Sequence, residues 1–243
     1  METSLHQRLK RLYASSEAQI EQNVGGYRID VVRDDELIEI QHASLSSIRR
    51  KVTALLKTHR VRVVKPLVVR KQIVRCAGKG RPVVGRRQSP KHANLLDLFD
   101  ELIYFTRIYP HPNLVLEVPL IIVEEWRYPA PPHRRGRRGR YRKAYIVEDQ
   151  RLVEVESVYE FRTPADLMRL LPDDLPDPFD TARLAVAMEV ERWFAQKITY
   201  CLRHMKAIEV VGKRGNTLLY RCPPHGVALG RNQAGEPGSR QAR

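Results

Sequence analysis

The sequence predicts an α/β protein whose C-terminal end forms a smaller unit of helices and one β-hairpin. Helical apolar repeats alternate with β-branched runs over the first ninety residues, and two long apolar runs follow between residues 114 and 158. Two further helical repeats and a glycine-containing turn come near the end of the chain. With 243 residues, of which 42% are hydrophobic, the chain can form one or two domains.

The first elements are expected to be a helix and two strands. Three leucines near the N-terminus recur at helical spacing, namely Leu5, Leu9 and Leu12. Gly25-Gly26 then interrupts the chain before a strand at residues 27–33, and a second strand covers residues 37–41. Helix, turn and paired strands are therefore predicted in this order.

An amphipathic helix is predicted next, over residues 45–57. Its apolar stripe consists of Leu45, Ile48, Val52, Leu55 and Leu56. The cations of this segment lie mostly off the stripe and give the helix a basic outer face: Arg49, Arg50, Lys51 and Lys57. The following stretch, residues 60–75, is apolar and β-branched, so it indicates a strand in which Pro66 marks an edge or a break.

The middle third is predicted to contain a helix at residues 94–104 and strands at residues 114–126 and 145–158. Between these strands, residues 127–143 hold eight cations and no acid among prolines and glycines, which indicates a mobile basic loop. This loop is either a solvated run of charge or an arm that follows phosphates. In the second case the contacts would come from Arg134, Arg135, Arg137, Arg138 and Arg140.

A proline-rich stretch at residues 170–179 is expected to link a separate C-terminal unit. Helices are predicted at residues 181–188 and 192–205, and a hairpin with the cationic tip 212–216 follows. The apolar stripe of the longer helix consists of Phe194, Ile198, Cys201, Leu202 and Met205. The expected divisions of the chain are a core at 1–90, an extension of helix and β-hairpin at 91–162, a C-terminal unit at 163–222 and a disordered tail at 223–243.

The charge of the chain favours a polyanionic partner, because the formal net charge is +15. The N-terminal segment lacks the apolar region of a secretory signal, and the longest apolar run, residues 114–123, is too short to span a bilayer. We therefore expect a cytoplasmic, nucleoid-associated protein with no membrane partner. Three widely spaced cysteines and the lack of P-loop or dinucleotide motifs argue against a disulfide scaffold, a zinc site and ATP- or NAD-dependent chemistry.

The most informative feature is the segment YRIDVVRDDELIEIQ, residues 27–41. A turn centred on Asp34-Asp35 makes the numbers of facing residues sum to 69, so Asp30 faces Glu39. Period two places Gln41 on the same face as Glu39. Opposed carboxylates repel unless a cation lies between them, and Mg²⁺ prefers oxygen ligands. The alternative is an exposed hairpin in which both carboxylates face water.

A strand with Asp30, a strand with Glu39-Ile40-Gln41 and the amphipathic helix, in this order, resemble the core of the PD-(D/E)xK nuclease superfamily. The string IEIQHASLSSI is similar to the ExQ variant of its competence CoiA-like branch, and the likeness covers roughly residues 1–75. It implies a restriction-endonuclease-like core of α-β-β-β-α-β order. It also implies that Asp30, Glu39 and Gln41 are catalytic, and that Asp30, Glu39 and the Ile40 carbonyl hold Mg²⁺ or Mn²⁺.

The sequence departs from this family where Gln41 replaces the usual catalytic lysine, because glutamine orients water but carries no positive charge. Lys51 or Arg49 on the following helix is expected to compensate, and Glu21 is an additional candidate ligand. Two residues of the first helix share a face at i, i+4 spacing and are expected to pack or to be exposed, with contact to a phosphate as the alternative: His6 and Lys10.

Residues 181–221 resemble a winged helix-turn-helix, with a positioning helix, a recognition helix and a wing. The outer face of the recognition helix is expected to present to a major groove Arg192, Gln196, Thr199, Tyr200 and Arg203. At the wing tip, Lys213 and Arg214 are expected to contact the DNA backbone or an adjacent minor groove.

These expectations describe a Mg²⁺-dependent DNA endonuclease, or a nuclease-like DNA-processing protein, that hydrolyses phosphodiester bonds and is positioned on duplex DNA by its winged helix. The first alternative is a catalytically inactive DNA-binding regulator or adaptor that lost its activity with the lysine. A second is RNA binding, because arginine-rich segments suit RNA as well as DNA. The sequence leaves the oligomeric state open, and a homodimer is compatible with it.

Overall fold

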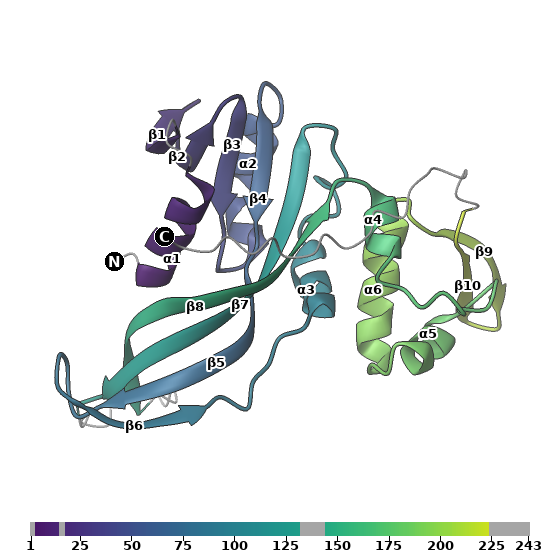
Figure 1. The fold of residues 1–243 in the computed structure, drawn as a ribbon. Coiled ribbons are helices and arrows are strands. Elements are labelled where there is room, and N and C mark those ends of the chain that lie inside the picture. The colour runs from purple at the N-terminus through teal and green to yellow at the C-terminus, as the bar shows by residue number, and fades with distance from the viewer. Residues whose placement is uncertain (1–2, 15–17, 132–143, 224–243) are drawn as a thin grey trace, which may run out of the picture.

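The computed structural model describes residues 3–14, 18–131 and 144–223, and these form a large mixed sheet with helices on both faces and a helical unit beside it (Figure 1). The chain is therefore a mixed α/β protein, as predicted. The first part contains, in chain order, α1 (Ser4–Tyr13), β1 (Gln19–Val24), β2 (Tyr27–Arg33), β3 (Glu36–Ile40), the 3-10 helix η1 (Leu45–Ile48), α2 (Arg49–Leu55) and β4 (Arg60–Val64).

The first four strands combine an antiparallel meander with one parallel neighbour. β2 pairs antiparallel with both β1 and β3, and β4 lies parallel to β3 after the crossover through η1 and α2. The predicted stripe of this crossover is confirmed, because all five of its apolar residues are buried. The stripe of α1 is wrong at one position: Leu12 is 52% exposed, whereas Lys10 is buried.

Long strands continue the sheet away from β1–β3. They are β5 (Leu67–Cys76), β6 (Val83–Gln88), β7 (Leu114–Pro129) and β8 (Tyr145–Phe161). β4 and β5 lie end to end along one edge of β7, and the break between them falls at Pro66, as predicted. β8 pairs with the opposite edge of β7. The boundary expected near residue 90 therefore falls inside one sheet.

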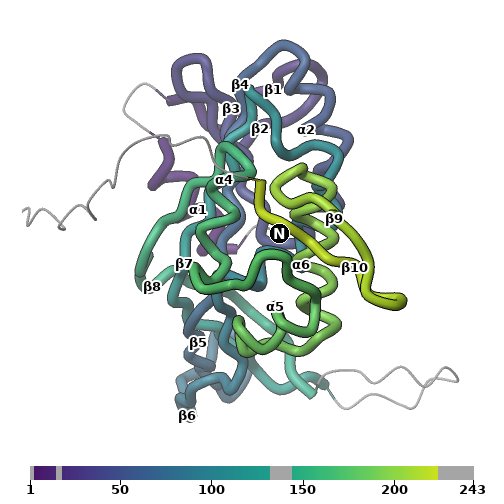
Figure 2. The backbone as a smooth tube through the Cα atoms, turned by 90° about the vertical axis from the view of Figure 1, so that its right-hand side faces the viewer, coloured from purple at the N-terminus to yellow at the C-terminus, as the bar shows by residue number. Residues whose placement is uncertain are grey.

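We call the distal part of these strands the arm, meaning residues 67–88, 120–129 and 145–157. Within it the strand order is β6-β5-β7-β8. In both views the arm extends away from β1–β3 (Figures 1 and 2). The arm thus carries its surface residues far from the start of the sheet.

The C-terminal unit packs against the sheet domain through a short helical segment, η2 (Leu95–Asp97) and α3 (Leu98–Leu102). Its elements are α4 (Pro164–Met168), α5 (Thr181–Ala187), α6 (Arg192–His204), β9 (Glu209–Arg214) and β10 (Thr217–Arg221). The predicted apolar stripe of α6 is buried throughout and belongs to the same hydrophobic core as α2 and α3. Leu171 and Phe179 of the proline-rich stretch are buried in this core too.

Two apolar cores lie on the two sides of β2 and β3. The smaller core joins α1 to the sheet through Leu5, Leu9, Val31, Ile38 and Ile40, among others. The larger one contains α2, α3 and the C-terminal unit. Within the described residues, no helix is long and apolar enough to cross a membrane.

Candidate active site

The predicted register of the acidic hairpin is confirmed from the turn to the pair Val31–Ile38. β2 ends at Arg33 and β3 begins at Glu36, which leaves Asp34-Asp35 as the turn, and the observed pairs down to Val31–Ile38 all sum to 69. Beyond this pair the strands separate, and the Ile40 N–H donates to Asp30 Oδ2 at 2.9 Å. Asp30 and Glu39 come one position beyond the last regular pair, and they lie close enough for the charge of Asp30 to raise the pKa of Glu39.

Asp30 is held as a carboxylate by residues of α1 and β3. His6 Nε2 lies 3.1 Å from its Oδ1, and Lys10 Nζ lies 3.2 Å from the same oxygen. Burial raises the pKa of Asp30, but the hydrogen bonds from His6 and from the Ile40 N–H outweigh burial and lower the pKa to about 2. The expected packing or exposure of His6 and Lys10 thus gives way to direct contact with Asp30.

Glu21 belongs to the same group of charges, which was the sequence's additional candidate. Lys10 Nζ bridges Glu21 Oε1 at 2.8 Å and Asp30 Oδ1. In the β1–β2 ladder Ile20 pairs with Val31 and Gln22 with Ile29, and Glu21 between them has a φ of 60°. A positive φ is uncommon for a residue with a side chain, so the backbone is strained where β1 passes Asp30.

Glu39 is buried, with 8% of its surface exposed, and its partner is a lysine from α2. Lys51 Nζ lies 2.6 Å from Glu39 Oε2 and also donates to the Arg28 carbonyl. Burial raises the pKa of Glu39, Lys51 opposes that shift, and the negative charge of Asp30 adds to it. Of the two compensating cations expected on this helix, Lys51 is in contact, whereas Arg49 lines an exposed hollow with Arg50 and Lys57.

Gln41 lies just after the end of β3 and stabilises the loop that leads to η1. Its N–H donates to the Val64 carbonyl at 2.8 Å, and its side-chain Nε2 donates to the Ser44 carbonyl at 2.8 Å and to the Ser47 hydroxyl. The amide nitrogen is thus engaged within the loop. Gln41 positions the chain beside Glu39 and adds no charge there.

Two residues that sequence reasoning missed complete the surroundings. Lys65 Nζ donates to the carbonyls of His42 and Ala43 at 3.0 and 2.7 Å and lies 3.3 Å from Glu101 Oε1. The His42 ring lies 5.5 Å from the His6 ring, and its buried Nε2 has no hydrogen-bond partner among the described residues. Burial lowers the pKa of His42 to about 4, so the ring is neutral near pH 7. No local pattern marks either residue, because both act through contacts across the fold.

The donor set fits a hard divalent cation that keeps much of its water. Among residues 3–14, 18–131 and 144–223, no three side chains of His, Cys, Asp or Glu gather closely enough to hold a metal by themselves. Mg²⁺ in phosphate-processing sites is commonly held by one or two carboxylates, with water and substrate phosphate oxygens completing its shell. The Asp30 and Glu39 carboxylates meet this requirement. The Ile40 backbone faces Asp30, on the side expected for a carbonyl ligand.

The expected DNA-contacting residues of the C-terminal unit are mostly exposed. On α6 these are Arg192, Gln196, Tyr200 and Arg203. The prediction that Thr199 lies on the outer face is wrong. It is 1% exposed and its side chain donates to the Gln196 carbonyl, because the turn of α6 directs it to the core. On β9, Lys213 is exposed, while Arg214 pairs with Asp180, the residue that caps α5.

The five arginines expected to follow phosphates lie outside the described residues. They are Arg134, Arg135, Arg137, Arg138 and Arg140.

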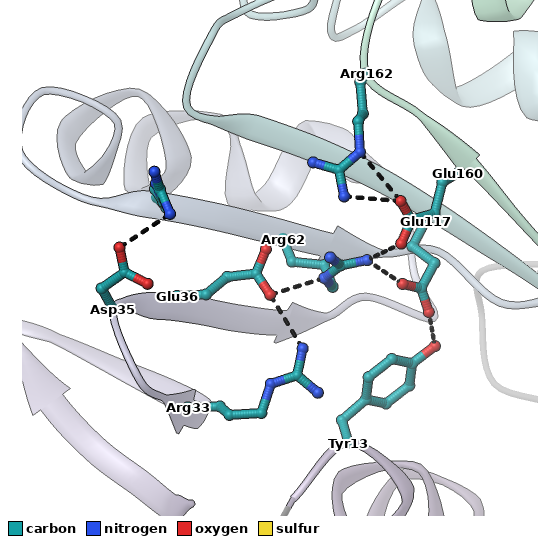
Figure 3. A network of polar contacts seen from close by, with 9 residues as sticks. Tyr13, Arg33, Asp35, Glu36, Arg62, Glu117, Glu160 and Arg162 are labelled. Atoms are coloured by element: carbon teal, nitrogen blue, oxygen red, sulfur yellow. Dashed lines mark hydrogen bonds and ion pairs between the residues drawn. The ribbon is translucent and has the colours of Figure 1, made fainter.

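A second charge cluster lies in the same sheet, and we call it the Arg62 cluster: Tyr13, Glu36, Arg62, Glu117 and Glu160 (Figure 3). Arg62 Nε donates to Glu36 Oε2 at 2.9 Å, and its Nη1 donates to Glu117 and Glu160. The Tyr13 hydroxyl donates to Glu117. One guanidinium thereby joins β3, β4, β7 and β8, and α1 is attached through Glu117.

A family model described as a domain of unknown function, DUF8091, matches residues 3–162 of the chain. The matched range runs from α1 to the end of β8 and contains both charge clusters. The chain is also similar to a protein of Treponema pallidum (strain Nichols) described as uncharacterized. The two are 31% identical over 232 residues, which cover 93% of this chain and 87% of that protein. No solved structure matches the chain.

Proposed function

We propose that this chain, which belongs to the DUF8091 family, hydrolyses phosphodiester bonds of DNA with the help of a divalent cation at Asp30 and Glu39. One observation carries the proposal: two carboxylates from adjacent strands lie just beyond the last regular pair, near enough to interact electrostatically, and helices bring a lysine to each of them. The likeness to PD-(D/E)xK nucleases in the sequence supports the same reading.

The protein's own groups have distinct roles in this proposal. Asp30 is ionised at all but very acidic pH, so it is ready to bind a cation, and Glu39 is the second ligand. A bound divalent cation supplies a water of lowered pKa and stabilises charge on the phosphodiester. Lys51 provides the positive charge that Gln41 lacks, since its ammonium group lies directly against Glu39.

His6 and Lys10 hold Asp30 in place from α1. Their contacts fix the Asp30 carboxylate, and Lys10 also fixes Glu21 beside it. The hydrogen bonds of the Gln41 side-chain amide restrain the loop after β3 and thereby the position of Glu39 near the end of that strand. The two carboxylates proposed to bind the cation are therefore positioned by two helices and one loop, in addition to the hairpin itself.

We propose further that α6 and the β9–β10 hairpin position the protein on DNA as a winged helix. The exposed residues of α6 include two arginines, a glutamine and a tyrosine, which are suited to phosphates and base edges. The net charge of +15 supports a nucleic-acid partner for the whole chain.

A second candidate function is that of a DNA-binding regulator without catalysis. The observation that favours it is that Lys10 and Lys51 already contact the two carboxylates. The cluster therefore reaches charge balance without a bound cation. In this case Asp30 and Glu39 would serve only to fix α1 and α2 on the sheet.

Cleavage of end-labelled linear, nicked and single-stranded DNA with Mg²⁺ or Mn²⁺ tests the proposal. Asp30→Ala and Glu39→Ala are expected to abolish metal-dependent cutting. Asp35→Ala is the matched control, because Asp35 is an exposed carboxylate in the turn of the same hairpin. Cutting that survives in both site variants would show a contaminating nuclease.

A thermal-shift measurement separates the two candidate functions. Divalent cations are expected to raise the Tm of the wild type and of Asp35→Ala, but not of Asp30→Ala, because ligand binding stabilises only the protein that has the site. Salt-sensitive DNA binding without cutting, and equal shifts in all three proteins, would favour the regulator.

A further inference from the structure

The arm carries a cavity of about 520 Å³ near its far end, well away from Asp30 and Glu39. Its apolar lining includes Ile73, Val84 and Pro129, and its aromatic lining is Tyr128 and Tyr145. Three arginines complete it: Arg75, Arg87 and Arg127. Cavities of this size, apolar with a few polar groups, are typical of small-ligand sites.

The strand register explains why the three arginines share one face of the arm. Arg75 on β5 pairs with Arg127 on β7 and with Gly85 on β6, and Arg87 pairs with Ile73 one step along the same face. A Cβ at position 85 would lie 3.1 Å from Arg75 Nη2. Glycine there leaves the Arg75 guanidinium room to lie over β6.

These arginines differ in how far the protein neutralises them. Arg127 pairs with the buried Glu125 and lies over the Tyr145 ring, 3.9 Å from its centroid. Arg75 and Arg87 are exposed and have no hydrogen-bond or ion-pair partner among the described residues. Like charges on neighbouring strands repel, so a bound anion would relieve the repulsion between them. The cavity thus combines two uncompensated guanidinium groups with an aromatic wall.

We infer that this cavity binds an unstacked nucleotide of single-stranded nucleic acid, with its base against Tyr128 and Tyr145 and its phosphates at Arg75 and Arg87. Single strands are bound in this way, by aromatic platforms and cationic side chains together. The bases of a duplex stay paired and stacked inside the helix, so they cannot contact the aromatic wall of the cavity. The inference deepens the proposed function and rests on its nucleic-acid substrate, because it names a single-stranded region as what the arm holds.

Binding of a labelled twelve-nucleotide oligothymidine to the full chain, in EDTA, tests this site. Arg87→Ala is expected to weaken binding about tenfold and to reduce the slope of log K against log salt by about 0.7, as for one lost phosphate contact. Arg86→Ala is the matched control, because Arg86 lies on the opposite face of β6 and pairs with Glu124 at 2.6 Å. Equal weakening by the two variants would show general attraction to charge and overturn the inference.

Tyr128→Ala tests the aromatic wall. It is expected to weaken oligothymidine binding about 5- to 100-fold, the range for loss of one stacked base, and to leave binding of a twelve-base-pair duplex unchanged. Tyr128→Phe keeps the ring and is expected to retain binding. Wild-type affinity in Tyr128→Ala, or equal losses for duplex and single strand, would contradict the inference.

Photocrosslinking locates the site without any substitution. An oligonucleotide containing bromodeoxyuridine is expected to crosslink at Tyr128 or Tyr145, whereas crosslinks confined to α6 would overturn the assignment. Neither assay requires cleavage. If oligonucleotide binding depends on the cavity but the protein cuts no DNA, the binding site is supported and the nuclease proposal fails. If the protein cuts DNA but its binding does not depend on the cavity, the nuclease proposal is supported and the binding site is contradicted.

Discussion

The Arg62 cluster and the Asp30–Glu39 cluster share the strand β3 but are built in opposite ways. In the first, one arginine lies at the centre and three carboxylates from β3, β7 and β8 surround it (Figure 3). In the second, two carboxylates lie at the centre, and lysines reach them from α1 and α2. A central cation ties strands together, whereas two central carboxylates, each with a lysine against it, form the arrangement that the proposed cation site would use.

The two clusters also differ in how they shift the pKa values of their members. Burial lowers the pKa of Arg62, but its carboxylate partners outweigh burial and raise that pKa, while burial and Glu117 raise the pKa of Tyr13. Both groups are therefore fixed in one state. Asp30 has a lowered pKa and Glu39 a raised one, although they occupy corresponding positions at the ends of neighbouring strands. Paired carboxylates whose pKa values are pushed apart are common at catalytic sites, and structural ion-pair networks shift pKa values as well.

The largest effect expected from this comparison is on stability, in the Arg62 cluster. Arg62→Met leaves the buried Glu117 and the half-buried Glu36 without their central cation, which is expected to lower the free energy of unfolding by about 3–5 kcal/mol. Urea unfolding measures this. Arg60→Met is the control, since Arg60 is 68% exposed in its pair with Asp35, and it is expected to cost below about 1 kcal/mol. Similar losses in both would remove the distinction.

The next largest effect is expected on catalytic activity, from a change in the Asp30–Glu39 cluster. Lys51→Met is expected to slow DNA cleavage about 100-fold, as for loss of one electrostatic group that acts on the transition state. Lys57→Met, an exposed lysine of the same segment, serves as control and is expected to cut at the wild-type rate. If Lys51→Met keeps full activity, the site does not use this lysine in place of the one that Gln41 replaces.

Neutralising one glutamate in each cluster gives a direct contrast in stability. Glu117→Gln weakens charge-assisted hydrogen bonds to Arg62 and Tyr13, so a loss of about 1–3 kcal/mol is expected. Glu39→Gln is expected to change the free energy of unfolding by less than about 1 kcal/mol, because burial already disfavours the charge of Glu39. Urea unfolding in EDTA compares them. A larger loss for Glu39→Gln would make its pair with Lys51 structural.

The smallest effect is a dependence on pH. Burial raises the pKa of Glu160, but its bonds to Arg62 lower it overall. A lowered pKa gives stability that is present above the unfolded value, near 4.3, and is lost as the pH falls through the folded value. Since the side chain is 40% exposed, the contribution is expected to stay below about 1 kcal/mol. Unfolding of Glu160→Gln at pH 7 and pH 3 should lack this acid-dependent part, and a larger difference would show deeper burial of its charge.

The local pattern of the sequence predicted the elements near the candidate site. A two-residue turn and a period of two predict the pairs from Arg33–Glu36 to Val31–Ile38, and the observed register agrees up to that point, one position before Asp30 and Glu39. Apolar spacing was enough to define the buried stripes of the 45–57 segment and of α6. These features depend on residues within about one helical turn or one hairpin of each other, which is the range that periodicity describes.

Tertiary structure alone decided which charges meet. Lys10 is buried in place of Leu12 because β2 brings Asp30 beneath α1, and Lys51 reaches Glu39 only because the crossover returns α2 over β3. The parallel pairing of β5 with β7 likewise brings Arg75 beside Arg127, fifty-two positions apart in the chain. Sequence patterns fix the face on which a side chain lies. The packing of distant elements, which is stabilised by burial of the shared apolar cores, decides which other side chains that face contacts.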